Sequence, residues 1–168
     1  MKKIICRALC LPVCALAATE PNAKSIEDTT TYEGDTIKIT IDQWCYAFNR
    51  TNLRFFVANV YVSDPAQMQT ASAGEQYSKN NAEATSAIAE RHDAILAING
   101  DYYGAQERGY VLRNGVLYRA SAQSGTDALV IGADGNFRII NEGETSADTL
   151  VREGAWQVLT FGPVLING

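Results

Sequence analysis

Histidine and cysteine are scarce in this chain of 168 residues, which contains one histidine, His92, and four cysteines. A Ser-His-Asp triad needs histidine as its base, and a zinc site draws most of its ligands from histidine and cysteine. The sequence therefore argues against both kinds of site. It also lacks a P-loop, a dinucleotide-binding glycine pattern, a His-Glu-x-x-His motif and a calcium loop, so we expect neither a metal nor a cofactor.

Long hydrophobic runs are missing as well. A helix that spans a bilayer needs about 20 apolar residues, and the run over residues 4–18 is shorter and contains Arg7. It follows Lys2 and Lys3 and includes Ala-Leu-Ala at residues 15–17, a small-x-small cleavage pattern. We predict a cleaved signal peptide over residues 1–18 of a bacterial precursor, and hence a secreted or cell-envelope protein. The alternatives are an uncleaved N-terminal anchor and a lipoprotein signal ending at Cys14, and we expect membrane contact only through this segment.

Basic residues become few once residues 1–18 are removed. Lys2, Lys3 and Arg7 leave with that segment, so 11 basic and 19 acidic residues remain, a net charge of −8. Such a surface repels phosphate backbones, and we expect no nucleic-acid partner. Only Cys45 remains of the four cysteines. This excludes an intramolecular disulfide and indicates a small buried side chain.

The next part of the chain is predicted to be a linker followed by a hairpin. Residues 19–34 are polar and rich in turn-forming residues, as a linker is. Ile37, Ile39 and Ile41 alternate with polar residues, which is the period of a half-buried strand. A second apolar run follows at residues 53–62, after a turn-like Asn-Arg-Thr-Asn segment. We predict a long antiparallel hairpin at the start of a single domain over residues 35–168.

A helix and a buried strand are predicted after the hairpin. Residues 81–91 carry a narrow apolar stripe, with Asn80 as N-cap and Glu83 placed to complete a capping box. His92 ends this helix, where an interaction with the helix dipole is favoured over a ligand or catalytic role. Residues 94–98, Ala-Ile-Leu-Ala-Ile, form a continuous apolar run that is typical of a fully buried central strand.

Strong turn signals organise the remainder of the chain. Asn114-Gly115 and Asp134-Gly135 each separate two short strand-like runs and supply the positive φ angles that tight hairpins need. A second helix is expected from Ser146 to Gly154, with Leu150 and Val151 facing inward, before a last strand over residues 155–161. The predicted fold is α+β, a twisted, mostly antiparallel mixed sheet with two short helices.

Residues 99–104 are the segment that could carry chemistry. Asn99, Asp101, Tyr102 and Tyr103 follow the predicted buried strand, and Gly100 and Gly104 let the backbone turn and a ligand approach. Amide and carboxylate groups beside aromatic rings suit a sugar, which offers hydroxyls and an apolar face. From spacing alone, a capped strand exit with two packing tyrosines is the alternative.

Three segments resemble the phosphodiester glycosidase family in content and order. They are Ala-Ile-Asn-Gly-Asp-Tyr-Tyr at residues 97–103, Gly-Tyr-Val-Leu-Arg-Asn-Gly-Val-Leu at residues 109–117, and Phe-Gly-Pro-Val-Leu with Asn-Gly at residues 161–168. The likeness spans roughly residues 53–168. Asp101 stands where the family more often has a second glycine, as in a bacterial subgroup. The family is named for an enzyme that removes N-acetylglucosamine from a phosphodiester, and bacterial members are often described as exopolysaccharide-related.

The resemblance implies a glycoside hydrolase that acts on a sugar-phosphate phosphodiester in a cell-envelope or extracellular glycan. By this resemblance Asp101 and Asn99 are the candidate catalytic residues. Gly100, Tyr102, Tyr103, Arg108 and Arg113 are candidates for substrate binding, the arginines through phosphate oxygens. For both arginines a solvated charge on a hairpin is the alternative. The competing function is a non-catalytic, secreted glycan-binding or envelope module.

The C-terminal end of the sequence carries a further expectation. Asn167-Gly168 is a dipeptide of the kind that precedes a second strand elsewhere in this chain. The family has a later Asn-Leu-Asp-Gly-Gly-Gly-Ser segment that helps to form its active site, and this sequence does not contain it. We therefore predict that the domain is incomplete at its C-terminus.

Overall fold

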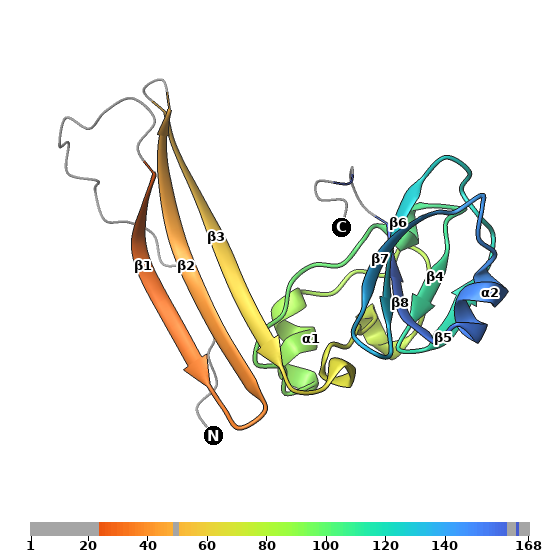
Figure 1. Cartoon of the computed structure of the whole chain (residues 1–168), viewed down its shortest axis with the longest axis horizontal. Helices are drawn as coiled ribbons and strands as arrows, with labels where there is room; N and C mark the ends of the chain where they lie inside the picture. Colours follow the sequence, from red (N-terminus) through yellow and green to blue (C-terminus); the bar gives the residue numbers. More distant parts are fainter. Residues whose placement is uncertain (1–23, 49–50, 161–163, 165–168) are drawn as a thin grey trace. The chain divides into compact units, whose positions relative to one another are not determined.

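The structure, a computed structural model, describes residues 24–48, 51–160 and 164. The described residues form two antiparallel sheets, one of three strands and one of five, with two short α-helices (Figure 1). The predicted fold class is confirmed. The chain divides into two compact units between Asp64 and Pro65. The predicted signal peptide over residues 1–18 lies outside the described residues.

The first unit contains a three-stranded antiparallel sheet in the order β1-β2-β3, with β1 Lys24–Glu33, β2 Ile37–Phe48 and β3 Thr51–Val62. Strands β2 and β3 pair along their whole length, from Ile37 with Val62 to Phe48 with Thr51, which confirms the predicted hairpin. Strand β1 corrects the linker predicted over residues 19–34. Its polar residues form a strand because they pair with β2, for example Thr29 Oγ1 with Asp42 at 2.7 Å.

The second unit contains a five-stranded sheet in the order β5-β4-β8-β6-β7. Its strands are β4 Val111–Arg113, β5 Val116–Arg119, β6 Asp127–Gly132, β7 Phe137–Asn141 and β8 Ala155–Leu159. Strand β8, the last of the described strands in sequence, lies between β4 and β6 and joins the two hairpins into one sheet. The chain therefore passes through both hairpins and α2 Ala147–Arg152 before it reaches the central strand of the sheet.

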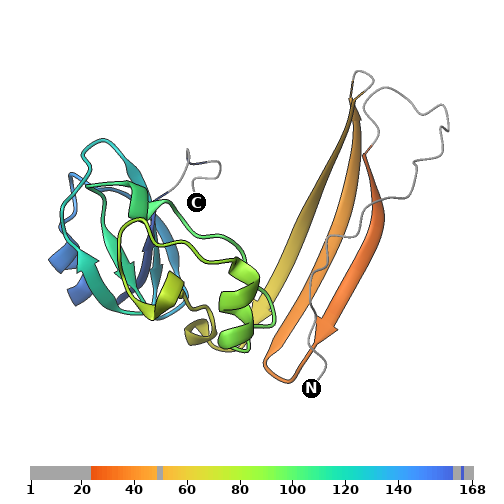
Figure 2. The ribbon, with the colours of Figure 1, turned by 180° about the vertical axis from the view of Figure 1, so that it is seen from behind.

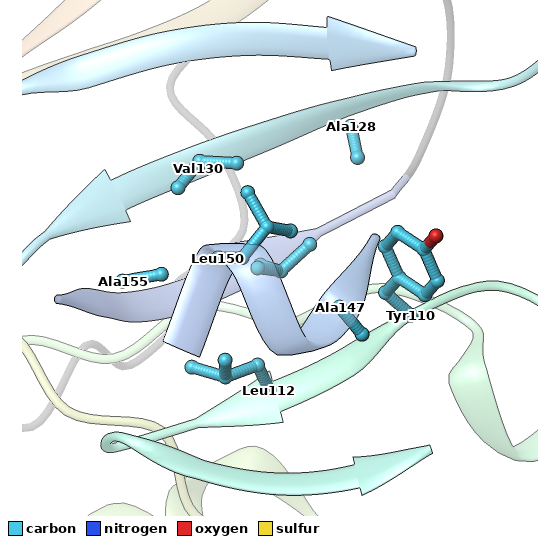
Figure 3. Close-up of a cluster of buried hydrophobic side chains, with 8 residues drawn as sticks. Tyr110, Leu112, Ala128, Val130, Ala147, Leu150 and Ala155 are labelled. Carbon is cyan, nitrogen blue, oxygen red and sulfur yellow. The ribbon is translucent and has the colours of Figure 1, made fainter. Parts of the chain in front are cut away.

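Helix α2 covers one face of this sheet and creates the core of the unit (Figure 3). Ser146 caps the helix, its Oγ accepting the N–H of Thr149 at 3.2 Å, and Gly154 follows it with φ +79°. Leu150 is buried as predicted, whereas Val151 is exposed, because a helix this short turns only one narrow side to the sheet. The core residues are Tyr110, Leu112, Ala128, Val130, Ala147, Leu150, Ala155 and Val158.

Both predicted hairpin turns are confirmed. Asn114 and Gly115 have φ +49° and +76°, which a two-residue turn between β4 and β5 requires. The Asn114 side chain also accepts the Thr70 N–H at 3.0 Å and the Gln157 Nε2–H at 2.7 Å, so it ties the preceding loop to the hairpin. In the β6–β7 hairpin, Gly135 takes the positive φ, +82°.

Two predictions in the middle of the chain are wrong. Helix α1 spans Thr85–Arg91, and Asn80 does not cap it, since the N-cap residue is Ala84. Residues 94–98 form no strand among the described residues, and Ile98 is 79% exposed. An apolar run becomes a buried strand only when a partner satisfies its backbone groups, and none of the described strands pairs with it.

The loops between Pro65 and Tyr110 lie mainly on the other side of the five-stranded sheet from α2, as the two opposite views show (Figure 2). They include the short 3-10 turns Pro65–Gln67, Ala73–Glu75 and Tyr103–Ala105. Arg91 of α1 forms ion pairs with Glu75 and Glu83, so the helix is attached to the preceding loop by charge. None of the helices in the described part of the chain is long and apolar enough to cross a membrane.

Candidate functional site

The centre of the candidate site is an ion pair between Asp101 and Arg113. The Arg113 Nη2 group donates to both carboxylate oxygens of Asp101, at 2.6 and 2.8 Å. Both side chains are buried, with 4% of Asp101 and 9% of Arg113 exposed. A charge pair with so little solvent around it is held in place, because either partner alone would leave an uncompensated buried charge.

Strand β4 positions Arg113 on the sheet face opposite α2. Successive side chains of a strand point to opposite faces, and Leu112 points into the α2 core. The Arg113 Nη1 group donates to the carbonyl oxygen of Leu112 at 3.1 Å and to that of Val158 on the neighbouring strand. Its guanidinium carbon lies 5.7 Å from the ring centroid of Tyr103. The arginine is therefore fixed by backbone, carboxylate and aromatic contacts together.

Thr160, at the end of β8, connects Asp101 to a second buried carboxylate. The Thr160 N–H donates to Asp101 Oδ2 at 3.0 Å, and its hydroxyl lies 3.1 Å from Glu142 Oε1. Glu142 also accepts the backbone N–H groups of Tyr110 and Gln123, both at 2.8 Å, and it is fully buried. Three donors compensate the burial of this carboxylate.

The hydroxyl of Tyr110 lies in the same buried region as Glu142, and this affects its pKa. It donates to the Thr145 carbonyl oxygen at 3.0 Å. Burial raises the pKa of Tyr110 above its ordinary value, and the nearby negative charge of Glu142 raises it further. Tyr110 therefore stays neutral and serves as a hydrogen-bond donor and core residue.

Arg119 holds the loop that carries Tyr103. Its Nε donates to the Gly109 carbonyl oxygen at 2.6 Å, and its Nη1 donates to those of Gln106 at 2.6 Å and Tyr103 at 3.1 Å. Gly109 has φ +102°, a conformation that strains any residue with a Cβ. One arginine on β5 thus fixes three carbonyl groups of the segment between Asp101 and β4.

The other predicted site residues lie outside the buried pair. The Asn99 side chain accepts a hydrogen bond from Thr85 of α1, and Gly100 has open space where a Cβ would be. Tyr102 and Arg108 are both exposed. The structure thus brings Asp101, Arg113 and Tyr103 together, and it does not place Asn99, Tyr102 or Arg108 in contact with them.

Sequence reasoning missed Glu142, Thr160 and Arg119. Glu142 follows Asn141 in a polar turn, where an acidic side chain is expected to be solvated. Thr160 stands just before the Phe-Gly-Pro segment at residues 161–163 and is not part of it. The only available signal for Arg119 was that it is a second arginine on the strands flanking Asn114-Gly115. Their contacts connect residues 10 to 59 positions apart, so local patterns do not reveal them.

Other places that a ligand could occupy lie apart from this pair. A hollow of about 250 Å³ is lined by residues of the β6–β7 hairpin, by Ala155 of β8 and by Glu153, which follows α2 and forms an ion pair with Arg138 of β7. Asp101 and Arg113 are not among its lining residues. Within residues 24–48, 51–160 and 164, no group of three or more His, Cys, Asp or Glu side chains could hold a metal ion.

Taken together, the described residues of the second unit form an antiparallel sheet domain that holds a buried carboxylate and guanidinium beside its central strands. Residues 92–168 match the model of the phosphodiester glycosidase family. The match begins later than the residue 53 expected from the motifs, and it contains Asp101, Arg113 and Glu142.

A curated relative gives a second comparison. The SPbeta prophage-derived uncharacterized protein YomE of Bacillus subtilis (strain 168) is 28% identical over 96 residues, which cover 54% of this chain and 15% of that protein. The chain therefore spans less than a sixth of the length of this relative. No solved structure matches the chain.

Proposed function

We propose that this protein hydrolyses the glycosidic bond between a sugar and a phosphate in a glycan of the cell envelope or the extracellular space. The observation that carries the proposal is the buried Asp101–Arg113 pair inside the segment that matches the model of the phosphodiester glycosidase family. The family supports the reaction class. The export signal predicted over residues 1–18 supports the location.

The chemistry needs few groups because phosphate is a good leaving group. Little acid assistance is required at the leaving oxygen, so the barrier lies at the anomeric carbon, which gains positive charge in the transition state. A carboxylate fixed nearby stabilises this charge, and a cation stabilises the departing phosphate. Asp101 supplies the carboxylate in this proposal, and Arg108 and Arg113 are the candidate cations.

The geometry divides these roles further. Asp101 is 4% exposed and both its oxygens accept from Arg113, so we expect it to act through its charge and not by attacking carbon. Arg113 is bonded to two carbonyl groups and to Asp101, so it orients the carboxylate. Arg108 is exposed, and in this proposal it binds the phosphate.

A hydrolysis assay on a panel of sugar-1-phosphodiesters tests the proposal. Asp101→Asn retains the shape and removes the charge, and we expect kcat to fall on the order of a hundredfold while KM changes little. Arg108→Gln is expected to raise KM, and Tyr103→Phe is expected to cost less than Asp101→Asn. Asp148→Asn removes an exposed carboxylate of the same unit and is the matched control.

Circular dichroism at the assay temperature separates loss of chemistry from loss of fold. Near-normal turnover in a folded Asp101→Asn variant would remove Asp101 from the mechanism. Absence of hydrolysis of every phosphodiester by the wild-type protein would overturn the proposed reaction.

A non-catalytic glycan-binding function is the second candidate. The observation that favours it is that Asp101 and Arg113 neutralise each other in a nearly dry environment, where a role in holding the loop is sufficient to explain them. This alternative predicts that glycans bind without turnover and that Asp101→Asn lowers stability without changing any rate.

A further inference from the structure

Three tyrosine rings form a continuous stack that leads away from the buried ion pair. Tyr103 stacks on Tyr77 with ring centroids 5.2 Å apart and planes at 21°, and Tyr77 stacks on Tyr118 at 5.0 Å and 28°. Arg113 lies over the Tyr103 ring. The rings come from three separate segments, so folding alone brings them together.

The outer end of the stack is open to solvent. Tyr118 lies on β5, an edge strand of the sheet, and is 47% exposed. Val116, two residues away on the same face of this strand, is 52% exposed. Soluble proteins usually protect an edge strand with charged side chains or proline, whereas here an aromatic ring and a valine are presented side by side. The exposed ring of Tyr118 offers a flat apolar surface on which a ligand can pack.

The inner end of the stack is rigid. Arg119 fixes the carbonyl groups of Tyr103, Gln106 and Gly109, and so holds the loop below the rings. The loop that carries Tyr77 is also close, because a Cβ at Gly104 would lie 3.7 Å from the Asn80 backbone nitrogen. Tyr118 stacks on Tyr77, which in turn stacks on Tyr103. A ring that is already stacked loses little freedom when a ligand covers it, which is how tyrosine gives contact area at low entropic cost.

We propose that Tyr118, supported by Tyr77 and Tyr103, is a stacking subsite for one uncharged pyranose ring of a glycan. This inference rests on the proposed function, since it adds a sugar subsite at the far end of the ring stack that begins at the Asp101–Arg113 pair. A pyranose has an apolar face of C–H groups that fits an exposed aromatic ring, and hydroxyls at its rim that remain in water. An anionic ligand such as nucleic acid is disfavoured by the net charge of −8 outside residues 1–18.

The subsite is tested by binding, independently of hydrolysis. The probes are the methyl glycosides of glucose, galactose, mannose and N-acetylglucosamine, together with the corresponding sugar 1-phosphates, followed by saturation-transfer NMR and titration of the full chain. We expect Tyr118→Ala to weaken binding about five- to tenfold for both sets of probes, as the loss of one ring contact implies. Tyr118→Trp is expected to retain or strengthen binding.

Phe137→Ala is the matched control, because Phe137 is an exposed aromatic residue on β7, the opposite edge strand of the same sheet. It should leave binding unchanged. If Tyr118→Ala binds as the wild type does, if Phe137→Ala weakens binding equally, or if no glycoside binds the wild-type chain at millimolar concentration, the subsite is overturned.

The two proposals fail separately. Tyr118-dependent binding of the neutral glycosides without hydrolysis of any phosphodiester would support the subsite and remove the proposed reaction. Hydrolysis with a KM that does not change in Tyr118→Ala would support the reaction and remove the subsite. The Tyr118→Phe variant keeps the ring and removes the hydroxyl, so normal binding by it is expected and identifies stacking as the cause.

Discussion

The two sheets of this chain show different ways of stabilising β-structure. The five-stranded sheet packs one face against α2 and buries eight residues in a single core, including Leu150. The three-stranded sheet has longer strands, yet among its described residues only Ile39 and Cys45 are buried hydrophobics. Two of its aromatic side chains stay largely in solvent, Phe56 at 67% and Tyr61 at 70% exposure. Covering one face with a single short helix therefore changes how the whole sheet is stabilised.

The two units also differ in whether their charged side chains are buried or exposed. The five-stranded unit contains a buried ion pair and a fully buried carboxylate, whereas the three-stranded sheet places Glu27 and Arg54 in an exposed pair at 3.0 Å. Buried charges are costly to leave unpaired, while exposed pairs contribute little because water screens them. Each unit holds one of the two tryptophans, Trp44 in the three-stranded sheet and Trp156 in β8, so unfolding of each can be followed by its own fluorescence.

The largest expected effect compares these two ion pairs. Arg113→Met should lower the free energy of unfolding of its unit by about 3–5 kcal/mol, because Asp101 becomes an unpaired buried charge. Arg54→Met, the matched variant in the other sheet, should cost about 0–1 kcal/mol. For Arg113→Met, denaturant unfolding is followed by the fluorescence of Trp156 in a Trp44→Phe background. For Arg54→Met, it is followed by the fluorescence of Trp44 in a Trp156→Phe background. Equal losses in both variants would contradict the comparison.

Two leucines sharpen the comparison of the apolar contacts. Leu150→Ala removes a side chain from the core and should cost about 2–5 kcal/mol through lost burial and the cavity left behind. Leu53→Ala in β3 should cost less than about 1 kcal/mol, since more than half of that side chain is already exposed. Denaturant unfolding followed by the fluorescence of Trp156 measures the first loss of stability, and that of Trp44 measures the second. A loss for Leu53→Ala as large as that for Leu150→Ala would contradict the comparison.

Glu142 gives a smaller effect of the same kind. Glu142→Gln retains an oxygen acceptor but replaces the other oxygen with an NH₂ donor, which faces the N–H of Tyr110 or Gln123. A buried donor without an acceptor costs about 1–3 kcal/mol. Glu33→Gln on β1, whose side chain is 70% exposed, should change stability by less than about 0.5 kcal/mol. Thermal unfolding of the two variants separates these values, and a neutral Glu142→Gln would mean that the site does not depend on this carboxylate.

The smallest effect is local and depends on pH. Hydrogen bonds from Arg91 and from the Gly74 N–H lower the pKa of Glu83 from 4.5 to about 2. Because the folded pKa is depressed, this contribution to stability is complete above pH 4.5 and is lost as the pH falls toward 2. The Gly74 amide should therefore exchange faster with solvent over that window, after correction for the intrinsic rate. NMR hydrogen exchange measures the rate for the Gly74 amide. Glu83→Gln should remove the pH dependence of this corrected rate, while the exchange rates of the β2 amides remain as in the wild type.

The elements that were predicted correctly have local causes. Asn114-Gly115 adopts positive φ angles by its own chemistry, and Ser146 accepts a hydrogen bond from Thr149 three residues away. The alternation of Ile37, Ile39 and Ile41 fixes a strand in the same way. Helix α1 was placed too early because Glu83, which was assigned to a capping box, instead bonds to Gly74 and Arg91.

The candidate site was only partly predictable for the same reason. The sequence singled out Asp101, Arg113 and Tyr103 separately, from a turn and a hairpin, and did not indicate that they touch. Asp101 was expected at the exit of a buried strand, whereas it is held by Arg113 and the Thr160 N–H. Glu142 and Tyr118 had no local signal at all.

The sequence by itself determined the turns, the second helix and the strand alternation, because each depends on residues that are neighbours in the chain. Only the tertiary structure decided that residues 94–98 are not a buried strand, because this depends on whether a partner strand is present. It also decided that Arg113 pairs with Asp101, that Glu142 is buried among three donors, and that three tyrosines stack. These are contacts between distant segments, and their free energy depends on burial and geometry that no local pattern contains.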